Sequence, residues 1–504
     1  MAALTSVEAR RDLFRQHVLR SGDFAVRYSR ERRHDDEALA RQRDNILQAM
    51  DACERYAAAS QTVVDIALSL HDHMERRGHW EVWEKHLERA VAASRKVGNA
   101  RVEGTLLNHL GEIRRDKGRW ASALALHEEA LRIFERLQDE TGRARSHQHL
   151  GCSWWLRGRW DRASEHFEVA LSIAQGLDEE GPDLVDLYRD LGRLSSYEGK
   201  WEEALGYLRR AAQMASRLGD AFRQIRACNS MGYAHWRRGE WAEARRVLQW
   251  AMEAAEQRSY ETRAAIACNN MAAVLLSQGA WEEALAYLKR DLKIVERIGA
   301  VHLAAHAYDD MGEAYRQAGQ WREAWQYLER SAAIKRQLDD LSGLAATYHH
   351  LGLLCTDVGE HKQAVGYHRQ ALALRERLRG KQDIAEVLVS LAGAYYHHFA
   401  ALRLSSERRR AEDEMRSVIG RAWTLGGRLG RSDLLTRLLW LKAEVALAEG
   451  SVEGARGAYE RALEISGDST GWCSESHGCA YANDRLVALH RETRTRLEAL
   501  KDHG

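Results

Sequence analysis

Three potential metal ligands lie within seven residues of one another near the end of the 504-residue chain. Cys473, His477 and Cys479 belong to the stretch "DSTGWCSESHGCA", and thiolate and imidazole groups are the usual protein ligands of zinc. A structural zinc site has four ligands, and the sequence offers no evident fourth. The alternative is a connecting loop with incidental thiols. We predict no metal site, and the three-ligand loop stays open as the other interpretation.

The remaining reactive side chains form no catalytic pattern. His71, His73 and His79, and separately His397 and His398, would titrate near pH 6.5 as ordinary surface histidines. The stretch "EGKW" lacks the Ser or Thr and the spacing of a phosphate-binding loop, and no His-Glu-x-x-His occurs. We therefore predict a protein that is not an enzyme and that needs no cofactor.

The side chains best suited to recognition are arginines, asparagines and aromatic rings at helical spacing. Arginine presents a planar fork to carboxylates, Trp and Tyr present rigid apolar surface, and Asn both donates and accepts hydrogen bonds. Side chains six and three residues before a recurring small residue, and one and four after it, step by 3, 4 and 3 and share one helix face. The predicted partner-binding residues at these offsets are Arg145, Gln148, Trp155, Arg189, Arg193, Arg226, Asn229, Tyr233, Trp236 and Asn269. The alternative is an ordinary solvated face on an arginine-rich chain.

Two short motifs recur and must position this face. Glycine followed two residues later by tryptophan returns at steps of 40 or 41 residues. The copies begin at Gly78, Gly118, Gly158, Gly199, Gly239, Gly279 and Gly319, and Gly359 continues the series with His in place of Trp. A Leu-Gly pair or a close variant of it lies seven residues before each glycine from Gly118 onward. A repeating structural unit of about 40 residues follows.

Each unit is predicted to form two antiparallel helices. In the second unit, counted from Leu110-Gly111, the first helix covers about 143–157 and the second about 161–177. The Gly of Gly-x-Trp ends the first helix in a left-handed conformation, the Trp fills the wedge between the helices, and the small residue of Leu-Gly lets the helices approach closely. Pro182 is the only proline, which favours long helices. One hairpin cannot bury its own apolar face, so the units must stack.

This framework resembles the tetratricopeptide repeat over about Val63 to Leu378. The resemblance implies an all-α, right-handed superhelical solenoid of antiparallel helix pairs whose first helices line a concave surface that holds protein segments. The units have 40 residues where the standard repeat has 34, and they lack its proline. The predicted domains are an N-terminal helical cap at 1–62, an array of about eight units at 63–380, degenerate units at 381–466, and a loop with a C-terminal capping helix at 467–504.

A second, shorter resemblance lies before the array. The stretch "LARQRDNILQAM", from Leu39 to Met50, resembles the junction where helical repeats begin in bacterial STAND-type regulatory ATPases. Asn45 and Ala49 fit that pattern, and Gln42 replaces its acidic residue. The resemblance implies a sensor that works with an effector protein encoded separately.

The leading prediction is a non-catalytic scaffold or adaptor that binds a protein or peptide partner in its concave groove. The arginines and aromatic rings favour a partner with acidic and bulky apolar side chains. One alternative is a regulatory sensor subunit of a STAND-like effector system. Another is a nucleic-acid-binding repeat protein with Trp155, Tyr197 and Trp236 as stacking groups, against which the net charge of +1 weighs.

The cysteines and the apolar segments predict a location. Seven cysteines are scattered, and Cys228, Cys268 and Cys355 fall on packing positions, which favours buried, reduced thiols. The first residues contain no apolar core of a signal peptide, and no apolar run approaches about 18 residues. We predict a cytoplasmic protein that does not enter a membrane.

Overall fold

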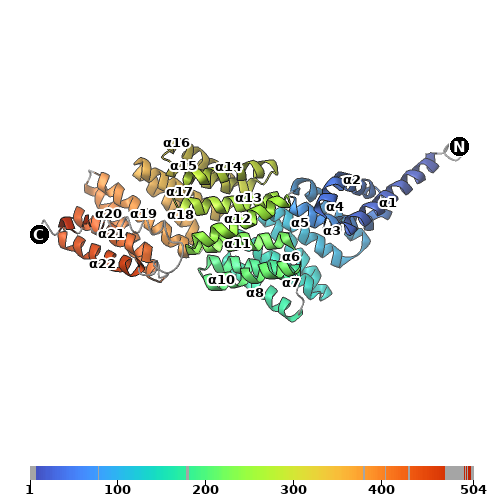
Figure 1. Ribbon diagram of the computed structural model, residues 1–504, viewed down its shortest axis with the longest axis horizontal. Helices are drawn as coiled ribbons and strands as arrows, with labels where there is room; N and C mark the ends of the chain where they lie inside the picture. The colour runs from blue at the N-terminus through green and yellow to red at the C-terminus, as the bar shows by residue number, and fades with distance from the viewer. Residues whose placement is uncertain are drawn as a thin grey trace.

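The computed structural model describes residues 7–33, 35–77, 79–177, 181–378, 381–402, 405–428, 432–470, 493, 495–496 and 498–500. Every regular element in these ranges is a helix, and the helices follow one another as antiparallel pairs along an elongated molecule (Figure 1). The predicted all-α solenoid is confirmed. None of the described helices combines the length and the apolarity that crossing a bilayer requires. Gly78, the predicted loop with Cys473, His477 and Cys479, and most of the predicted capping helix lie outside the described residues.

The helices before the unit of Leu110-Gly111 are α1 (Val7–Glu31), α2 (Asp36–Glu54), the short 3-10 helix η2 (Ala57–Ala59), α3 (Ser60–Arg76) and α4 (Trp80–Val97). Seven pairs form the units that begin with Leu110-Gly111: α5 (Ala100–Asp116) with α6 (Trp120–Leu137), α7 (Glu140–Leu156) with α8 (Trp160–Leu177), α9 (Pro182–Tyr197) with α10 (Trp201–Arg217), α11 (Ala221–Arg238) with α12 (Trp241–Gln257), α13 (Glu261–Ser277) with α14 (Trp281–Arg297), α15 (Val301–Gln317) with α16 (Trp321–Gln337), and α17 (Leu341–Val358) with α18 (His361–Leu378). Two further pairs follow: α19 (Lys381–Ala401) with α20 (Ser405–Arg428), and α21 (Ser432–Ala448) with α22 (Val452–Thr470).

The turn inside each of the seven units has the predicted geometry. Its glycine has a positive φ of 72° to 91°, which a residue with a Cβ atom adopts only at a cost. The Trp or His two residues later is the first residue of the second helix. The Trp ring is buried at Trp120 and Trp241, as predicted, whereas Trp321 is 40% exposed and fills no wedge.

The two helices of a unit approach closely at the small residue of the Leu-Gly pair. A methyl group placed on Gly232 would lie 2.5 Å from Leu248, and one on Gly312 would lie 2.5 Å from Leu328. The side chain that faces this position is Leu or Phe in five of the seven units. It is His127 in the first unit and His368 in the seventh.

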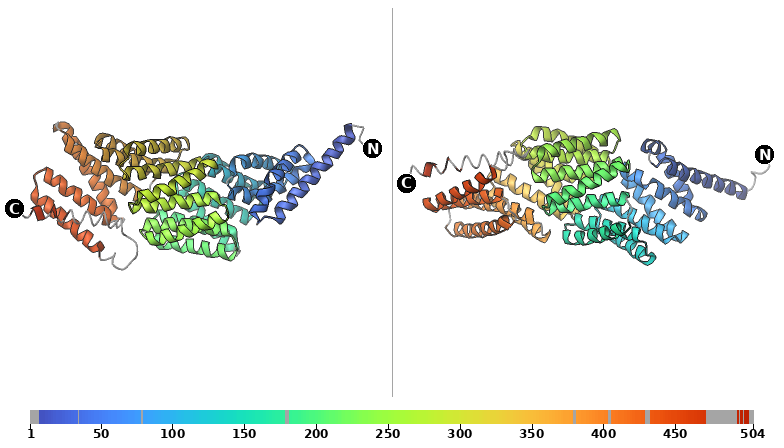
Figure 2. Two further views of the ribbon diagram at one scale, coloured as in Figure 1. Left: turned by 45° about the horizontal axis from the view of Figure 1, so that its top comes forward. Right: turned by 60° about the horizontal axis from the view of Figure 1, so that its bottom comes forward.

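Successive turns of the superhelix pack against each other. Tyr260 donates a hydrogen bond of 3.1 Å to Asp36, and a methyl group on Gly118 would lie 3.1 Å from Leu338. These partners are 224 and 220 residues apart, or about five and a half units. One apolar cluster accordingly joins side chains of α3 and α4 to side chains of α13, α14 and α15. The ribbons of the two turns lie side by side at this place (Figures 1 and 2). The first helices of the middle units therefore face an interior that other turns partly cover.

A matched pair of glycine substitutions would test this contact between turns. Gly158 and Gly359 both have positive φ, and a Cβ atom on Gly158 would overlap Leu378 of the next turn, whereas one on Gly359 would meet nothing within 4 Å. We expect each Gly→Ala change to cost about 1–2 kcal/mol in free energy of unfolding because of the left-handed backbone. Gly158→Ala should cost about 1–3 kcal/mol more because of the overlap, and should expand the molecule in small-angle X-ray scattering. Equal effects of the two variants would argue against close packing of the turns there.

Candidate functional site

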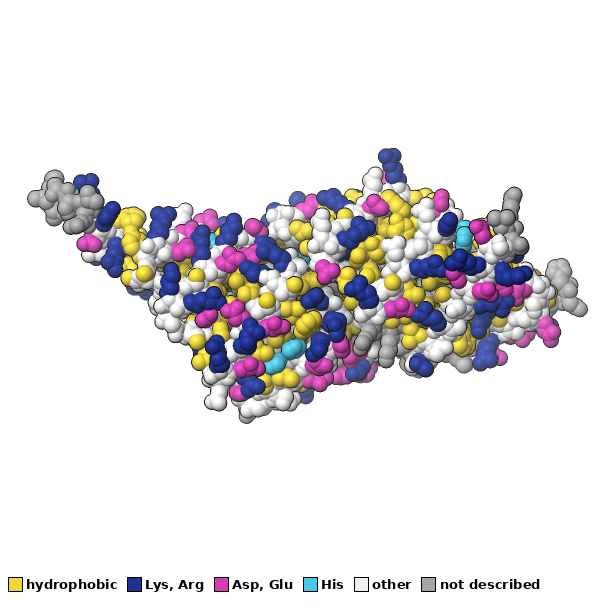
Figure 3. All heavy atoms as spheres, turned by 180° about the vertical axis from the view of Figure 1, so that it is seen from behind, with side chains coloured by type: hydrophobic (Ala, Val, Ile, Leu, Met, Phe, Trp, Pro, Cys, Tyr) yellow, Lys and Arg dark blue, Asp and Glu magenta, His cyan; other side chains and the backbone are white. Residues whose placement is uncertain are grey.

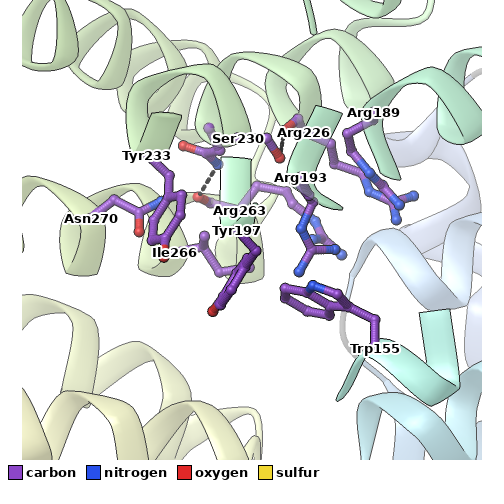
Figure 4. A pocket seen from close by; sticks show the side chains of 11 residues that line it. Trp155, Arg189, Arg193, Tyr197, Arg226, Ser230, Tyr233, Arg263, Ile266 and Asn270 are labelled. Atoms are coloured by element: carbon purple, nitrogen blue, oxygen red, sulfur yellow. Dashed lines mark hydrogen bonds between the residues drawn. The ribbon is translucent and has the colours of Figure 1, made fainter. Parts of the chain in front are cut away.

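A cavity of about 230 Å³ opens on the inner face of the middle units. It lies between α7, α9, α11 and α13, the first helices of four consecutive units, and we call it the arginine–aromatic pocket (Figure 4). Among the residues that the structure describes, its lining contains four arginines, three aromatic rings and no carboxylate. The lining residues are Trp155, Arg189, Arg193, Tyr197, Arg226, Asn229, Ser230, Tyr233, Arg263, Ile266 and Asn270.

The residue positions predicted from helical spacing account for much of the lining of this pocket. Six of the predicted residues line the pocket together: Trp155, Arg189, Arg193, Arg226, Asn229 and Tyr233. The offsets missed Tyr197, Ser230, Arg263 and Asn270. One further step of three residues would have found Arg263, which lies nine residues before Ala272, the small residue of its unit.

Arg145 and Gln148 lie in an adjoining cavity of about 370 Å³, which also touches Arg189 and Arg226. Both side chains are already engaged there. Arg145 forms an ion pair of 2.5 Å with Asp183, and Gln148 donates a hydrogen bond of 3.0 Å to Asp190. This cavity mixes carboxylates with arginines and histidines, in contrast to the arginine–aromatic pocket.

Trp236 and Asn269 line neither cavity. The Trp236 indole donates a hydrogen bond of 2.8 Å to Ser277, and its ring packs edge-on against Tyr233 with 5.5 Å between ring centroids. Asn269 donates a hydrogen bond of 2.9 Å to Asp310. Trp236 therefore supports the pocket from behind Tyr233, and Asn269 connects neighbouring helices.

Arg189 is a buried member of an ion-pair network and is only 6% exposed. Its guanidinium lies 2.6 Å from Asp190 and 3.1 Å from Asp186. Burial alone would raise the pKa of Asp190, but Arg189 and Arg193 hold that pKa below its usual value. Arg189 is therefore already neutralised by side chains of its own helix.

Two other arginines of the lining are less completely paired. The Arg193 guanidinium lies 3.9 Å from the centroid of the Trp155 ring, a cation–π contact, and 3.6 Å from Asp190 (Figure 4). Arg226 lies 3.2 Å from Asp186 and 3.9 Å from Glu75 of α3. These distances leave both side chains able to contact a further anion.

Arg263 is the least compensated charge of the lining. Its Nε atom is buried and has no hydrogen-bond partner among the described residues, and no ion pair of its guanidinium with them is found. Burial, followed by repulsion from Arg226, lowers the pKa of Arg263 to about 10. The guanidinium is therefore charged at neutral pH, and it would gain from a nearby anion.

Asn229 and the tyrosines complete the wall. The Asn229 amide donates a hydrogen bond of 3.2 Å to the Arg263 carbonyl. Its Oδ1 atom is buried and has no partner within the described ranges, and the residue is only 4% exposed. The rings of Tyr197 and Tyr233 stack with 6.2 Å between centroids, and Arg237 donates a hydrogen bond of 3.2 Å to the Tyr233 hydroxyl. The pocket thus offers positive charge, one free acceptor and aromatic surface.

A cluster of His71, His109 and Glu112 has the residue types of a metal site but not its geometry. The Trp83 indole donates a hydrogen bond of 3.1 Å to Nδ1 of His71, which leaves the ring proton on Nε2, facing Glu112 at 3.4 Å. The His71 and His109 rings stack 3.7 Å apart and within 4° of parallel, so their nitrogen lone pairs do not converge on one ion. The expectation of surface histidines is wrong for His71 and His73, which are 3% and 1% exposed.

The described thiols are buried, as predicted for Cys228, Cys268 and Cys355. Burial raises the pKa of Cys228 and of Cys355 to about 11 and that of Cys268 to about 12. These thiols are therefore protonated at neutral pH and unreactive as nucleophiles.

Comparison with known proteins gives matches at the level of the repeat and of the fold. Models of the tetratricopeptide repeat match residues 102–176, 183–257, 262–337 and 344–385. A Rap protein complexed with Competence and Sporulation Factor is 14% identical, with a TM-score of 0.46 over 70% of this chain and 99% of that chain. The apo quorum sensor NprR from B. thuringiensis is 16% identical, with a TM-score of 0.47 over 70% and 98% of the two chains. A STAND protein with a tetratricopeptide repeat sensor from Pyrococcus horikoshii is 13% identical, with a TM-score of 0.47 over 74% and 54%.

Proposed function

Because the chain belongs to the tetratricopeptide repeat family, we propose that it is a non-catalytic scaffold that binds a segment of a partner protein on the inner face of its first helices. The observation that carries this proposal is the composition of the arginine–aromatic pocket. Four arginines and three aromatic rings converge there, and no carboxylate of the described ranges lines it. An isolated protein stabilises such a concentration of positive charge less well than a complex with an anionic partner would.

The face of the molecule in Figure 3 differs from the pocket in its distribution of charge. On the face seen in Figure 3, basic and acidic side chains are interspersed. The chain as a whole carries a net charge of +1, so the positive excess is a local property of the arginine–aromatic pocket. A partner with acidic and bulky apolar side chains matches that wall, because rigid rings contact apolar groups while guanidinium groups pair with carboxylates.

The predicted site residues then divide by role. Trp155, Arg193, Arg226, Asn229 and Tyr233 would contact the partner in the pocket. Arg145 and Gln148 would extend the binding surface into the adjoining cavity. Arg189, Trp236 and Asn269 would hold the wall in place, because their polar groups already have partners within the protein.

The direct test compares two arginine variants in affinity capture from cells of the native organism, followed by binding measurements with the captured partner. Arg193→Ala removes an arginine of the pocket that is 34% exposed and only weakly paired. Arg246→Ala removes an arginine of α12 that is 72% exposed. We expect Arg193→Ala to weaken binding about tenfold, or by ~1.4 kcal/mol, and Arg246→Ala to leave it unchanged. Equal binding by both variants and the unmodified protein would count against the proposal.

The cytoplasmic location and the four-part division of the chain are also proposals. The location is supported by the thiols, since all five described cysteines are unpaired and buried, as expected in a reducing compartment. The division between the array and the units that follow it is supported by helix length. The helices α19 and α20 have 21 and 24 residues and are longer than the helices of the 40-residue units.

A further inference from the structure

We propose that the arginine–aromatic pocket binds one carboxylate that is flanked by an N–H donor and by an aromatic or branched apolar group. A peptide presents this grouping at an acidic residue or at its C-terminal residue. The inference rests on the proposed function, and it names the part of the partner that enters the pocket. Its three parts follow from the charge, the unpaired acceptor and the rings of the lining.

The charge balance around the pocket sets the charge of the ligand. Five arginines form one network with the lining: Arg189, Arg193, Arg223, Arg226 and Arg263. Four carboxylates pair with them: Glu75, Asp186, Asp190 and Asp220. Among these paired groups the arginines outnumber the carboxylates by one, and Glu75 and Asp116 also attract Arg263 from beyond ion-pair distance. A carboxylate carries one negative charge and a phosphate monoester about 1.5 to 2, so we expect this partly paired network to accommodate a carboxylate better.

The position of the excess charge sets where the carboxylate lies. Arg263 has no ion-pair partner in the part of the chain that the structure describes, and Arg193 is 3.6 Å from the nearest carboxylate oxygen there, so these two guanidinium groups would gain most from a new anion. Figure 4 shows Arg193 above Trp155, with Tyr197 beside them. A carboxylate that contacts both arginines would therefore have aromatic surface next to it.

The unpaired acceptor explains why a donor must accompany the carboxylate. Oδ1 of Asn229 is buried and accepts no hydrogen bond from the described residues, and Nδ2 of that amide is fixed by its hydrogen bond to the Arg263 carbonyl. A buried acceptor without a partner is costly, and the amide N–H of a peptide would satisfy it. In a peptide, this N–H lies a few bonds from the carboxylate, as the pocket requires.

The size of the pocket limits how much of the ligand it can hold. At about 230 Å³ it is smaller than the 300–1,000 Å³ that is typical of sites for drug-sized ligands. Trp155, Tyr197, Tyr233 and Ile266 supply its apolar surface. One acidic residue or one terminal residue with its neighbour fits this space, and the rest of the partner would lie along the inner face.

The test measures binding of small probes to the full chain by isothermal titration calorimetry. N-acetylphenylalanine carries a terminal carboxylate, and N-acetyl-glutamyl-phenylalanine amide carries a side-chain carboxylate. N-acetylphenylalanine amide is the uncharged control, and phenyl phosphate tests the other class of anion. We expect at least one carboxylate probe to bind about tenfold more tightly than the uncharged amide and than phenyl phosphate. Which carboxylate probe binds better shows whether the pocket takes a terminus or a side chain.

Variants connect the probe to the pocket. Arg263→Gln should weaken the carboxylate probe about tenfold, Arg263→Lys should restore part of the loss, and Arg246→Gln should have no effect. The inference is overturned if neither carboxylate probe exceeds the uncharged amide, if phenyl phosphate binds more tightly, or if Arg263→Gln leaves the affinity unchanged. If the probes fail while capture of the partner still depends on Arg193, only this inference fails and the proposed function stands.

Discussion

Arg189→Met should lower the free energy of unfolding by about 3–5 kcal/mol. Arg189 is buried, and its main partner Asp190 is 2% exposed. Removing the guanidinium leaves the Asp190 carboxylate with hydrogen bonds from Gln148 and Cys152, and with Arg193 at 3.6 Å. These contacts do not replace a direct ion pair in a site that water reaches poorly.

The loss would be measured by chemical denaturation followed by circular dichroism. Arg246→Met, in an exposed pair with Glu243, is the control, and we expect it to change the stability by no more than ~0.5 kcal/mol. A double variant that also changes Asp190 to Leu should recover much of the loss, because no unpaired charge is then buried. If Arg189→Met and Arg246→Met cost the same, Arg189 is not the structural ion pair described above, and it becomes available to a partner.

His368→Leu should stabilise the protein and remove part of its sensitivity to acid. His368 is fully buried beneath Gly352, and neither of its ring nitrogens has a hydrogen-bond partner among the described residues. Leu occupies the same position in the four units that contain Leu208, Leu248, Leu288 and Leu328. A leucine therefore fits the geometry of this site, and it leaves no buried polar atom unsatisfied.

The dependence on pH follows from the shifted ionisation of this ring. Burial lowers the pKa of His368 to about 4, whereas an unfolded chain would show about 6.5. The unfolded state therefore binds more protons between these values, so the stability due to neutral His368 is complete above pH 6.5 and is lost as the pH falls toward 4. At pH 5 the loss is about 2 kcal/mol.

Denaturant titrations at pH 7 and pH 5 would reveal this contribution. The fall in stability between the two pH values should be about 2 kcal/mol smaller in His368→Leu than in the unmodified protein. Leu328→His places the same ring beneath Gly312 and should produce the opposite change. Identical pH dependence in the unmodified protein and in His368→Leu would show that the ring is protonated equally in both states.

The repeat made most of the fold predictable. The period of about 40 residues placed α7 and α8 to within three residues of their observed bounds, because the Gly-x-Trp turn is a local signal. The same regularity brought Arg193 and Asn229 to one wall, since residues at steps of three and four share a helix face whatever surrounds the helix. Local geometry was sufficient for these features.

The contacts between turns of the superhelix depend on how small rotations between successive units add up, and these rotations could not be predicted from the sequence. The contact of Asp36 with Tyr260 requires a specific rise and rotation over more than five units. The pairing of Arg189 requires knowledge of side-chain conformations, which decide whether a charge faces a cavity or a neighbouring carboxylate. For the same reason, His71 and His73 were expected at the surface and are buried between helices.

The contact between turns also restricts how this array can change in length. Gain or loss of one whole unit would keep an apolar side chain at the contact between turns, because Ile298 and Leu378 occupy the positions equivalent to Leu338 in the neighbouring units. It would nevertheless misalign individual partners such as Asp36 and Tyr260, which occur once each. The units are therefore not interchangeable, because the contacts between turns require each unit to keep its position in the array.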